Sequence, residues 1–180
     1  MHFSTLGDFA RYLESVGELH RVTIEVDPYL EITEIATRAI KEHKPALWFE
    51  RVRGSKFPLV INLLASDRRC ELALQKHPQK LGEELIQFLG DILPPTPSTV
   101  LRHTSLLKRF FHAPPRTGGS AVSQEVVETP NLDELPILTC WPEDGGRFIT
   151  LPQVVTYDPR TGKRNMGIYR MHVFDRQTTG

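Results

Sequence analysis

The sequence holds 180 residues, of which 39% are hydrophobic, and this length suits one domain of ordinary size or one domain and part of another. Lys and Arg number 22 and so do Asp and Glu, so the formal net charge of zero gives no reason to expect a nucleic-acid partner. The polar N-terminus, the absence of an apolar run of about 18 residues and the two distant cysteines predict a soluble, cytoplasmic protein with no integral membrane segment and no disulfide framework.

The first half of the chain alternates helix and strand patterns. Apolar residues recur at helical spacing over 4–16, where Ser4 or Thr5 can cap the helix, and alternation over 19–26 predicts a half-buried strand. The pair Asp27-Pro28 predicts the start of a second helix. The remaining predicted elements are strands at 46–52 and 59–64 and helices at 66–75 and 79–92. This alternation is typical of an α/β domain.

Proline-rich segments interrupt the chain after residue 92. Segments 94–97 and 113–120 both read as breaks, with a short predicted helix at 98–111 between them. We therefore place the domain boundary between the two breaks. The predicted domains are an N-terminal α/β domain with a helical linker over 1–112 and a β-rich domain over 113–180.

The β-rich part is predicted to contain a hairpin. Its strands are expected over Phe148–Tyr157 and Asn165–Phe174, and the turn residues of 158–163 join them. A lone hairpin is marginally stable in water, so the chain is expected to stop inside a β-domain.

The second predicted strand carries the string Asn165-Met166-Gly167-Ile168-Tyr169-Arg170. The amide oxygen of Asn165 suits a hard cation, Gly167 lets a ligand approach the backbone, and Arg170 can hold a phosphate or carboxylate with two hydrogen bonds. The string therefore indicates a site for an anionic cofactor and its counter-ion. Taken without any resemblance, the sequence favours the ordinary readings, in which Asn165 is a turn residue and Arg170 is a solvated strand residue.

A second unusual string, Thr139-Cys140-Trp141-Pro142-Glu143-Asp144, lies upstream. Cys140 has no His/Asp arrangement around it and is interpreted as a packing residue. Adjacent side chains on an extended chain point to opposite faces, so Glu143 and Asp144 are a poor acid/base pair. We interpret this string as a wall of the site. His172 would share a face with Arg170 on a regular strand, and we assign it no role.

Both strings, in this order and spacing, resemble the UbiD family of prenylated-FMN-dependent decarboxylases. Segments 9–14, 26–35 and 45–50 resemble the opening elements of the same family, so the resemblance covers nearly all of the chain. It implies that the N-terminal α/β domain is followed by the beginning of a split β-barrel that binds flavin.

The resemblance also implies residue roles. Asn165 would bind a divalent metal, Mn²⁺, that bridges to the flavin phosphate, with K⁺ as a further candidate cation. Arg170 would be catalytic by holding the substrate carboxylate, and Ile168, Tyr169 and Arg170 would contact the cofactor together with Thr150. An Arg stays charged and cannot donate the proton, so a separate acid is needed. By resemblance that acid and the other metal ligands lie beyond Gly180, so the 180 residues alone are predicted to be inactive.

The implied function is non-oxidative decarboxylation of a small hydroxylated aromatic acid with prenylated FMN supplied by a flavin prenyltransferase. The acid could be 4-hydroxy-3-polyprenylbenzoate of ubiquinone biosynthesis, or an aromatic acid of the menaquinone pathway or of aromatic degradation. We expect a homo-oligomer. The alternatives are a non-catalytic assembly or accessory subunit and, with less support, a plain FMN oxidoreductase. The reading frame after Gly180 separates the enzyme from the subunit.

Overall fold

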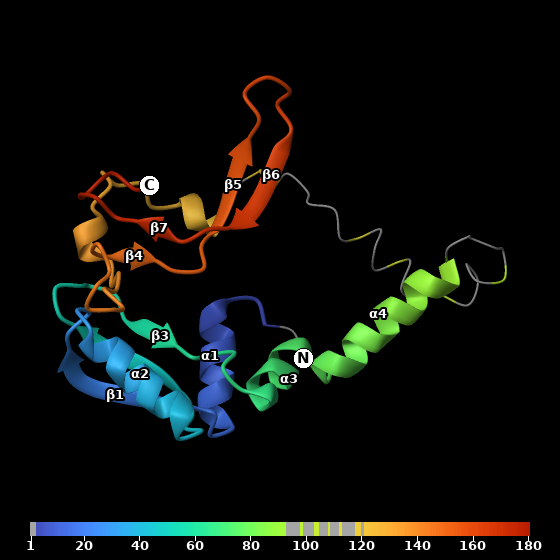
Figure 1. Ribbon diagram of the computed structural model, residues 1–180, viewed down its shortest axis with the longest axis horizontal. Helices are drawn as coiled ribbons and strands as arrows, with labels where there is room; N and C mark the ends of the chain where they lie inside the picture. Colours follow the sequence, from blue (N-terminus) through green and yellow to red (C-terminus); the bar gives the residue numbers. More distant parts are fainter. Residues whose placement is uncertain are drawn as a thin grey trace. The chain divides into compact units, whose positions relative to one another are not determined.

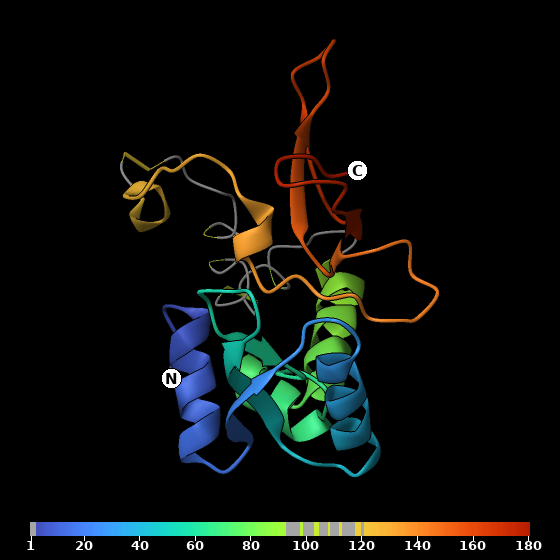
Figure 2. The same ribbon diagram turned by 90° about the vertical axis from the view of Figure 1, so that its left-hand side faces the viewer.

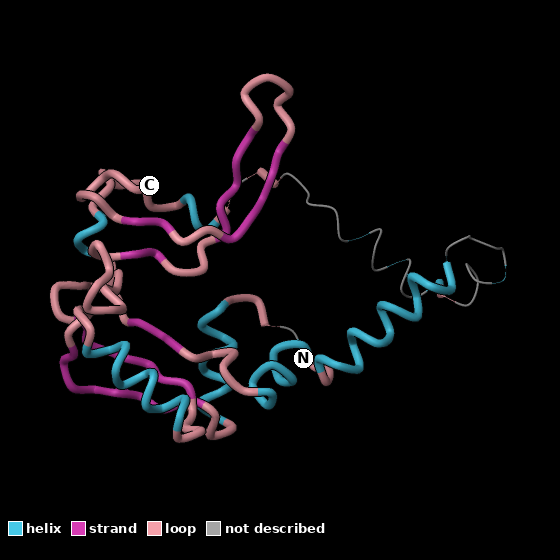
Figure 3. The backbone as a smooth tube through the Cα atoms, viewed as in Figure 1, coloured by secondary structure: helices cyan, strands magenta, loops and turns pink. Residues whose placement is uncertain are grey.

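A computed structural model of the chain describes residues 3–92, 98, 103, 104, 108, 112, 118, 119 and 121–180 (Figure 1). These residues group into two compact units, Met1–Arg69 with Thr129–Gly180, and Cys70–Glu128. The α-helices with described bounds lie between Leu6 and Ile92, and the last third of the chain consists mainly of short strands joined by loops (Figure 3). The predicted breaks at 94–97 and 113–120 and the predicted helix at 98–111 fall largely outside the described residues.

A three-stranded sheet forms the centre of the first unit. Its strands are β1 (Leu19–Val26), β2 (Ala46–Val52) and β3 (Leu59–Ile61), in that order. Strands β1 and β2 are parallel, so α2 (Glu31–Lys41) makes the crossover between them, whereas β3 pairs antiparallel with β2. Helices α1 (Leu6–Ser15) and α2 flank the sheet from its two sides (Figure 2). The predicted α/β class is confirmed.

The two helix starts show where sequence signals hold and where tertiary contacts replace them. Thr5 caps α1 in a capping box with Asp8, as the sequence predicts. The prediction that Asp27-Pro28 opens the second helix is wrong, because α2 begins only at Glu31. The intervening backbone bonds instead to a distant segment: the Leu30 N–H donates to the Thr139 carbonyl at 3.0 Å, and the Thr139 N–H donates to Pro28 at 3.2 Å.

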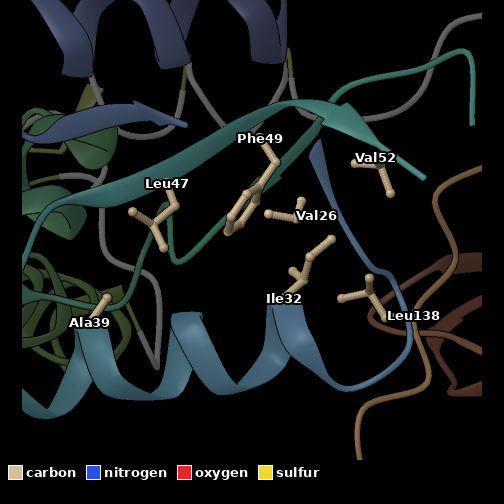
Figure 4. Packing of buried hydrophobic residues seen from close by; sticks show 7 residues of the cluster. All are labelled: Val26, Ile32, Ala39, Leu47, Phe49, Val52 and Leu138. Carbon is tan, nitrogen blue, oxygen red and sulfur yellow. The ribbon is translucent and has the colours of Figure 1, made fainter. Parts of the chain in front are cut away.

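The core lies between the sheet and α2 (Figure 4). Alternation along β2 turns Leu47 and Phe49 toward α2, where Phe49 and Ile32 are fully buried. Leu138 joins the same cluster from more than 80 residues further along the chain. The segment that carries the second unusual string is thereby anchored to the N-terminal sheet.

Two further helices follow, α3 (Asp67–Leu74) and α4 (Pro78–Ile92), and both agree with the predicted ranges to within a residue at each end. Two single-turn 3₁₀ helices, η1 (Val122–Gln124) and η2 (Leu132–Glu134), precede the strands of the C-terminal part. No helix in the described part of the chain is both long and apolar enough to cross a membrane.

The predicted hairpin forms, but its two strands are not continuous. Strand β5 (Gln153–Tyr157) pairs antiparallel with β6 (Arg164–Ile168), and β4 (Phe148–Ile149) pairs separately with β7 (Met171–His172). The prediction of two unbroken strands is therefore wrong. Leu151 adopts a left-handed φ of 58° before Pro152, which has no N–H to donate, and this pair separates β4 from β5. In the described residues the two small sheets do not close into a barrel.

Candidate functional site

The register of β5 and β6 assigns the predicted site residues to two faces of the hairpin. Asn165 lies opposite Thr156, and Gly167 lies opposite Val154, so these four residues share one face. Ile168 lies on the other face, opposite Gln153. The tripeptide that the resemblance assigns to the cofactor therefore begins on the face opposite to Asn165.

Asn165 is exposed, and its side chain makes no hydrogen bond with the residues that the structure describes. Its amide oxygen is thus available to a cation. The same residues contain no group of three His, Cys, Asp or Glu side chains that could hold a metal ion. An amide oxygen is a chemically suitable ligand for a hard cation, and the assignment of Asn165 to a metal stays a prediction.

Gly167 lies under the ring of Tyr169. A Cβ atom at position 167 would come within 2.5 Å of the Tyr169 ring, closer than real Cβ contacts. The Tyr169 N–H donates to the Pro152 carbonyl at 3.4 Å, and this bond joins the end of β6 to the break before β5. The glycine thus allows the aromatic ring to cover the strand backbone, while both Ile168 and Tyr169 stay more than half exposed.

Arg170 occupies the gap between β6 and β7, where it contacts Asp144 and Phe148 of the upstream segment. Its Nη1 donates to Asp144 Oδ1 at 3.1 Å and its Nη2 donates to Asp144 Oδ2 at 2.7 Å, which is the two-point geometry of an Arg–carboxylate pair. The guanidinium carbon lies 3.8 Å from the centre of the Phe148 ring. Arg170 is therefore held by a carboxylate and an aromatic face.

Charge pairing shifts the titration of both partners. The hydrogen bonds from Arg170 lower the pKa of Asp144 below its ordinary value, and Asp144 in turn raises the pKa of Arg170. Both groups are therefore charged throughout the neutral range. Asp144 is therefore a carboxylate, not a proton donor, in that range.

His172 of β7 packs next to the Arg170–Asp144 pair, against Phe148 and Gly145. Its ring stacks on Phe148 with centroids 4.5 Å apart, and its Nε2 lies 3.1 Å from the Gly145 carbonyl. Gly146 has a φ of 143°, and a Cβ atom there would meet His172 Nε2 at 3.0 Å. The loop after Trp141 thus needs glycine where it passes the histidine. His172 and Arg170 both contact Phe148, although Arg170 is not part of a regular strand.

The structure brings only some of the predicted site residues together. Thr150 is exposed in the segment between β4 and β5. In the described residues no hydrogen bond or ion pair joins Asn165 to Arg170. The important partner that sequence reasoning missed is Asp144, because the sequence pattern indicates only that this residue lines a wall of the site. The available signal for this pair was that one distinctive string carries a carboxylate and the other carries an Arg.

Two family profiles match the chain. The 3-octaprenyl-4-hydroxybenzoate carboxy-lyase N-terminal domain matches residues 10–89, and the 3-octaprenyl-4-hydroxybenzoate carboxy-lyase Rift-related domain matches residues 116–180. The division between them is compatible with the boundary expected near residue 112, which stays a prediction.

Relatives cover the whole chain. An uncharacterized protein of Archaeoglobus fulgidus is 44% identical over 181 residues, which is 100% of this chain and 37% of that protein. An uncharacterized protein of Chlamydia trachomatis is 40% identical over 178 residues, 98% of this chain and 30% of that protein. The chain thus spans about a third of the length of these relatives.

Solved structures of UbiD-class enzymes match the fold of the chain. The UbiD-class enzyme HmfF from Pelotomaculum thermopropionicum in complex with FMN has a TM-score of 0.71 at 27% identity, over 95% of this chain and 35% of that one. The closed form of Sedimentibacter hydroxybenzoicus vanillic acid decarboxylase has a TM-score of 0.75 at 27% identity, over 100% of this chain and 37% of that one. Profiles for both parts of the chain and structures of this class together show that the chain belongs to the UbiD family.

Proposed function

We propose that this chain is the N-terminal part of a prenylated-FMN-dependent enzyme that decarboxylates an aromatic carboxylic acid without oxidation. The observation that carries the proposal is Arg170, which contacts both Asp144 and Phe148 and lies two residues after the strand that carries Asn165. A decarboxylase must orient the carboxylate of its substrate, and a fixed guanidinium does so with two hydrogen bonds.

Each residue of the site has a proposed task. Arg170 binds and orients the carboxylate, and it stays charged, so a different group must return the proton. Ile168, Tyr169 and Arg170 contact the flavin, and Thr150 lines its site. Asn165 contributes an oxygen to Mn²⁺, with K⁺ as a further candidate cation. When it is bound, prenylated FMN supplies the electron sink for loss of carbon dioxide.

The finer proposals concern substrate and partners. We propose a hydroxylated aromatic acid, with 4-hydroxy-3-polyprenylbenzoate of ubiquinone biosynthesis first and an acid of the menaquinone pathway or of aromatic degradation as the alternative. A flavin prenyltransferase would supply the cofactor in the cytoplasm. Homo-oligomerisation is proposed as well; among the similar solved structures, HmfF has an evolved dimeric form in complex with prFMN.

The first experiment is the intact mass of the native protein from its source cells, with the flavin spectrum recorded on the same sample. A mass well above 20.5 kDa with a bound modified flavin is expected. Arg170→Lys should then abolish most turnover, because an ammonium cannot reproduce the planar fork. A mass near 20.5 kDa without flavin would overturn the proposal and favour an assembly or accessory subunit.

A further inference from the structure

The two partners of the Arg170–Asp144 ion pair differ in their exposure to solvent. The side chain of Asp144 is 11% exposed, whereas that of Arg170 is 41% exposed, so the carboxylate is the buried partner and the guanidinium reaches the surface. A guanidinium carries five N–H donors, and the two that bond to Asp144 leave others for a second anion. The pair can therefore hold Arg170 in place and still leave it able to bind a ligand.

Asp144 is itself fixed by the turn that contains it. Its N–H donates to the Trp141 carbonyl at 3.1 Å, and its Oδ2 accepts the Trp141 N–H at 3.3 Å. The loop continues through Gly145, whose carbonyl lies against His172. These hydrogen bonds hold the Asp144 carboxylate in one position, so it can restrict the conformations of the Arg170 side chain.

The adjacent carboxylate offers a contrast. Glu143 is exposed, and within the described residues it forms no ion pair. Of the two neighbouring acids, only Asp144 forms an ion pair with the proposed substrate-binding Arg. This difference provides a matched control, because a change at Glu143 removes the same charge from the same loop.

We propose that Asp144 is a positioning residue, which holds the guanidinium of Arg170 at the orientation needed to receive the substrate carboxylate. This inference rests on the proposed function of Arg170. Without Asp144, the four rotatable bonds of the Arg side chain would have to be ordered by the substrate itself, and the entropy of that ordering would be subtracted from binding.

The alternative to a positioning role is competition with the substrate for Arg170, and the two roles predict opposite changes in carboxylate affinity when Asp144 is removed. Asp144 could compete with the substrate by occupying the donors that a carboxylate needs. A positioning residue makes carboxylate binding weaker when it is removed, whereas a competing residue makes it stronger. The sign of the change therefore decides between them.

The experiment measures benzoate and benzamide binding by calorimetry to the full-length, flavin-loaded protein and to its Asp144→Asn, Glu143→Gln and Arg170→Lys variants. Asn keeps the side-chain oxygen that accepts the Trp141 N–H, so the turn is retained while the charge is lost. Hydrogen exchange of the peptide that covers the loop checks this, and Asp144→Glu provides a second variant that restores the charge.

Asp144→Asn is expected to weaken benzoate binding about 10-fold, similar to the smallest losses seen when a residue that orients a metal ligand is removed, and to leave benzamide binding unchanged. Glu143→Gln should stay within about twofold of wild type, and Asp144→Glu should recover part of the benzoate affinity. In turnover with an aromatic acid, kcat should fall more than KM rises.

If wild type prefers benzoate over benzamide and Arg170→Lys loses this preference, the proposed role of Arg170 stands. In that case the inference about Asp144 would be overturned if Asp144→Asn had the same benzoate affinity as Glu143→Gln. It would also be overturned if Asp144→Asn bound benzoate more tightly than wild type. A flavin-loaded wild type with no preference for benzoate over benzamide would overturn the proposed role of Arg170, and the inference with it.

Discussion

Arg69 offers the sharpest test of the forces that hold the first unit together. It lies in α3 with only 4% of its side chain exposed, and its Nη1 donates to Glu18 Oε2 at 3.2 Å. Its Nε donates to the Asn62 carbonyl at 3.0 Å, and Nη1 also approaches the Lys44 carbonyl at 3.4 Å. One side chain thus joins the segments that follow α1, α2 and β3, so its replacement should destabilise the packing of all three elements.

The expected magnitude follows from these contacts. Removing one partner of a buried ion pair costs roughly 3–5 kcal/mol, because the remaining charge and the carbonyl oxygens lose their donors. The Glu18 side chain keeps 27% of its exposure, so water can replace part of what Arg69 supplies. We therefore expect Arg69→Met to lower the free energy of unfolding of this unit by about 3 kcal/mol.

Native-state hydrogen exchange of β1 and β2 amides is the assay, since it reports on this unit whatever else the chain carries. Arg38→Met is the matched control: Arg38 pairs with Glu34, but the two side chains are 68% and 66% exposed. An exposed pair of this kind is worth about 0–1 kcal/mol. If Arg69→Met lost no more than Arg38→Met, the reasoning about buried donors would be refuted.

The other predictions use the same unit. Phe49→Ala removes a fully buried ring and should lower the free energy of unfolding by about 3–5 kcal/mol, measured by hydrogen exchange. Phe57→Ala removes a half-exposed ring and should lower it by less than about 1 kcal/mol. Equal losses would contradict the assigned core. Thr5→Ala removes a capping oxygen and should cost about 1 kcal/mol, seen as faster exchange in the first turn of α1. Arg170 lowers the folded-state pKa of Asp144, so the stabilisation from this pair is present above the ordinary value of 3.8 and is lost as the pH falls through the lower folded-state pKa. Asp144→Asn should flatten acid unfolding in that range, and an unchanged pH profile would argue against the pair.

Local signals were sufficient where the chain's own neighbours decide the structure. Thr5 and Asp8 are three residues apart, so the capping box of α1 could be predicted from the sequence. The turn chemistry between β5 and β6 was visible for the same reason, because Asp158 accepts from the N–H groups of Arg160 and Thr161.

Distant partners account for what sequence reasoning missed. Asp27-Pro28 carries a genuine helix-start pattern, but the backbone after it bonds to Thr139, and the helix begins later. Glu143 and Asp144 are a poor acid/base pair with each other, but the partner of Asp144 in the fold, Arg170, lies 26 residues away. A pattern along the chain cannot show which Arg a carboxylate will meet.

The isolated bridge between Tyr29 and Thr139 has a consequence for the order of events during synthesis. A ribosome adds roughly 5–20 residues per second. Thr139 follows Tyr29 by roughly 110 residues, so it is made about 5–20 seconds later. Until then, the nascent sheet lacks Leu138, and the apolar patch that this residue covers faces water or a chaperone.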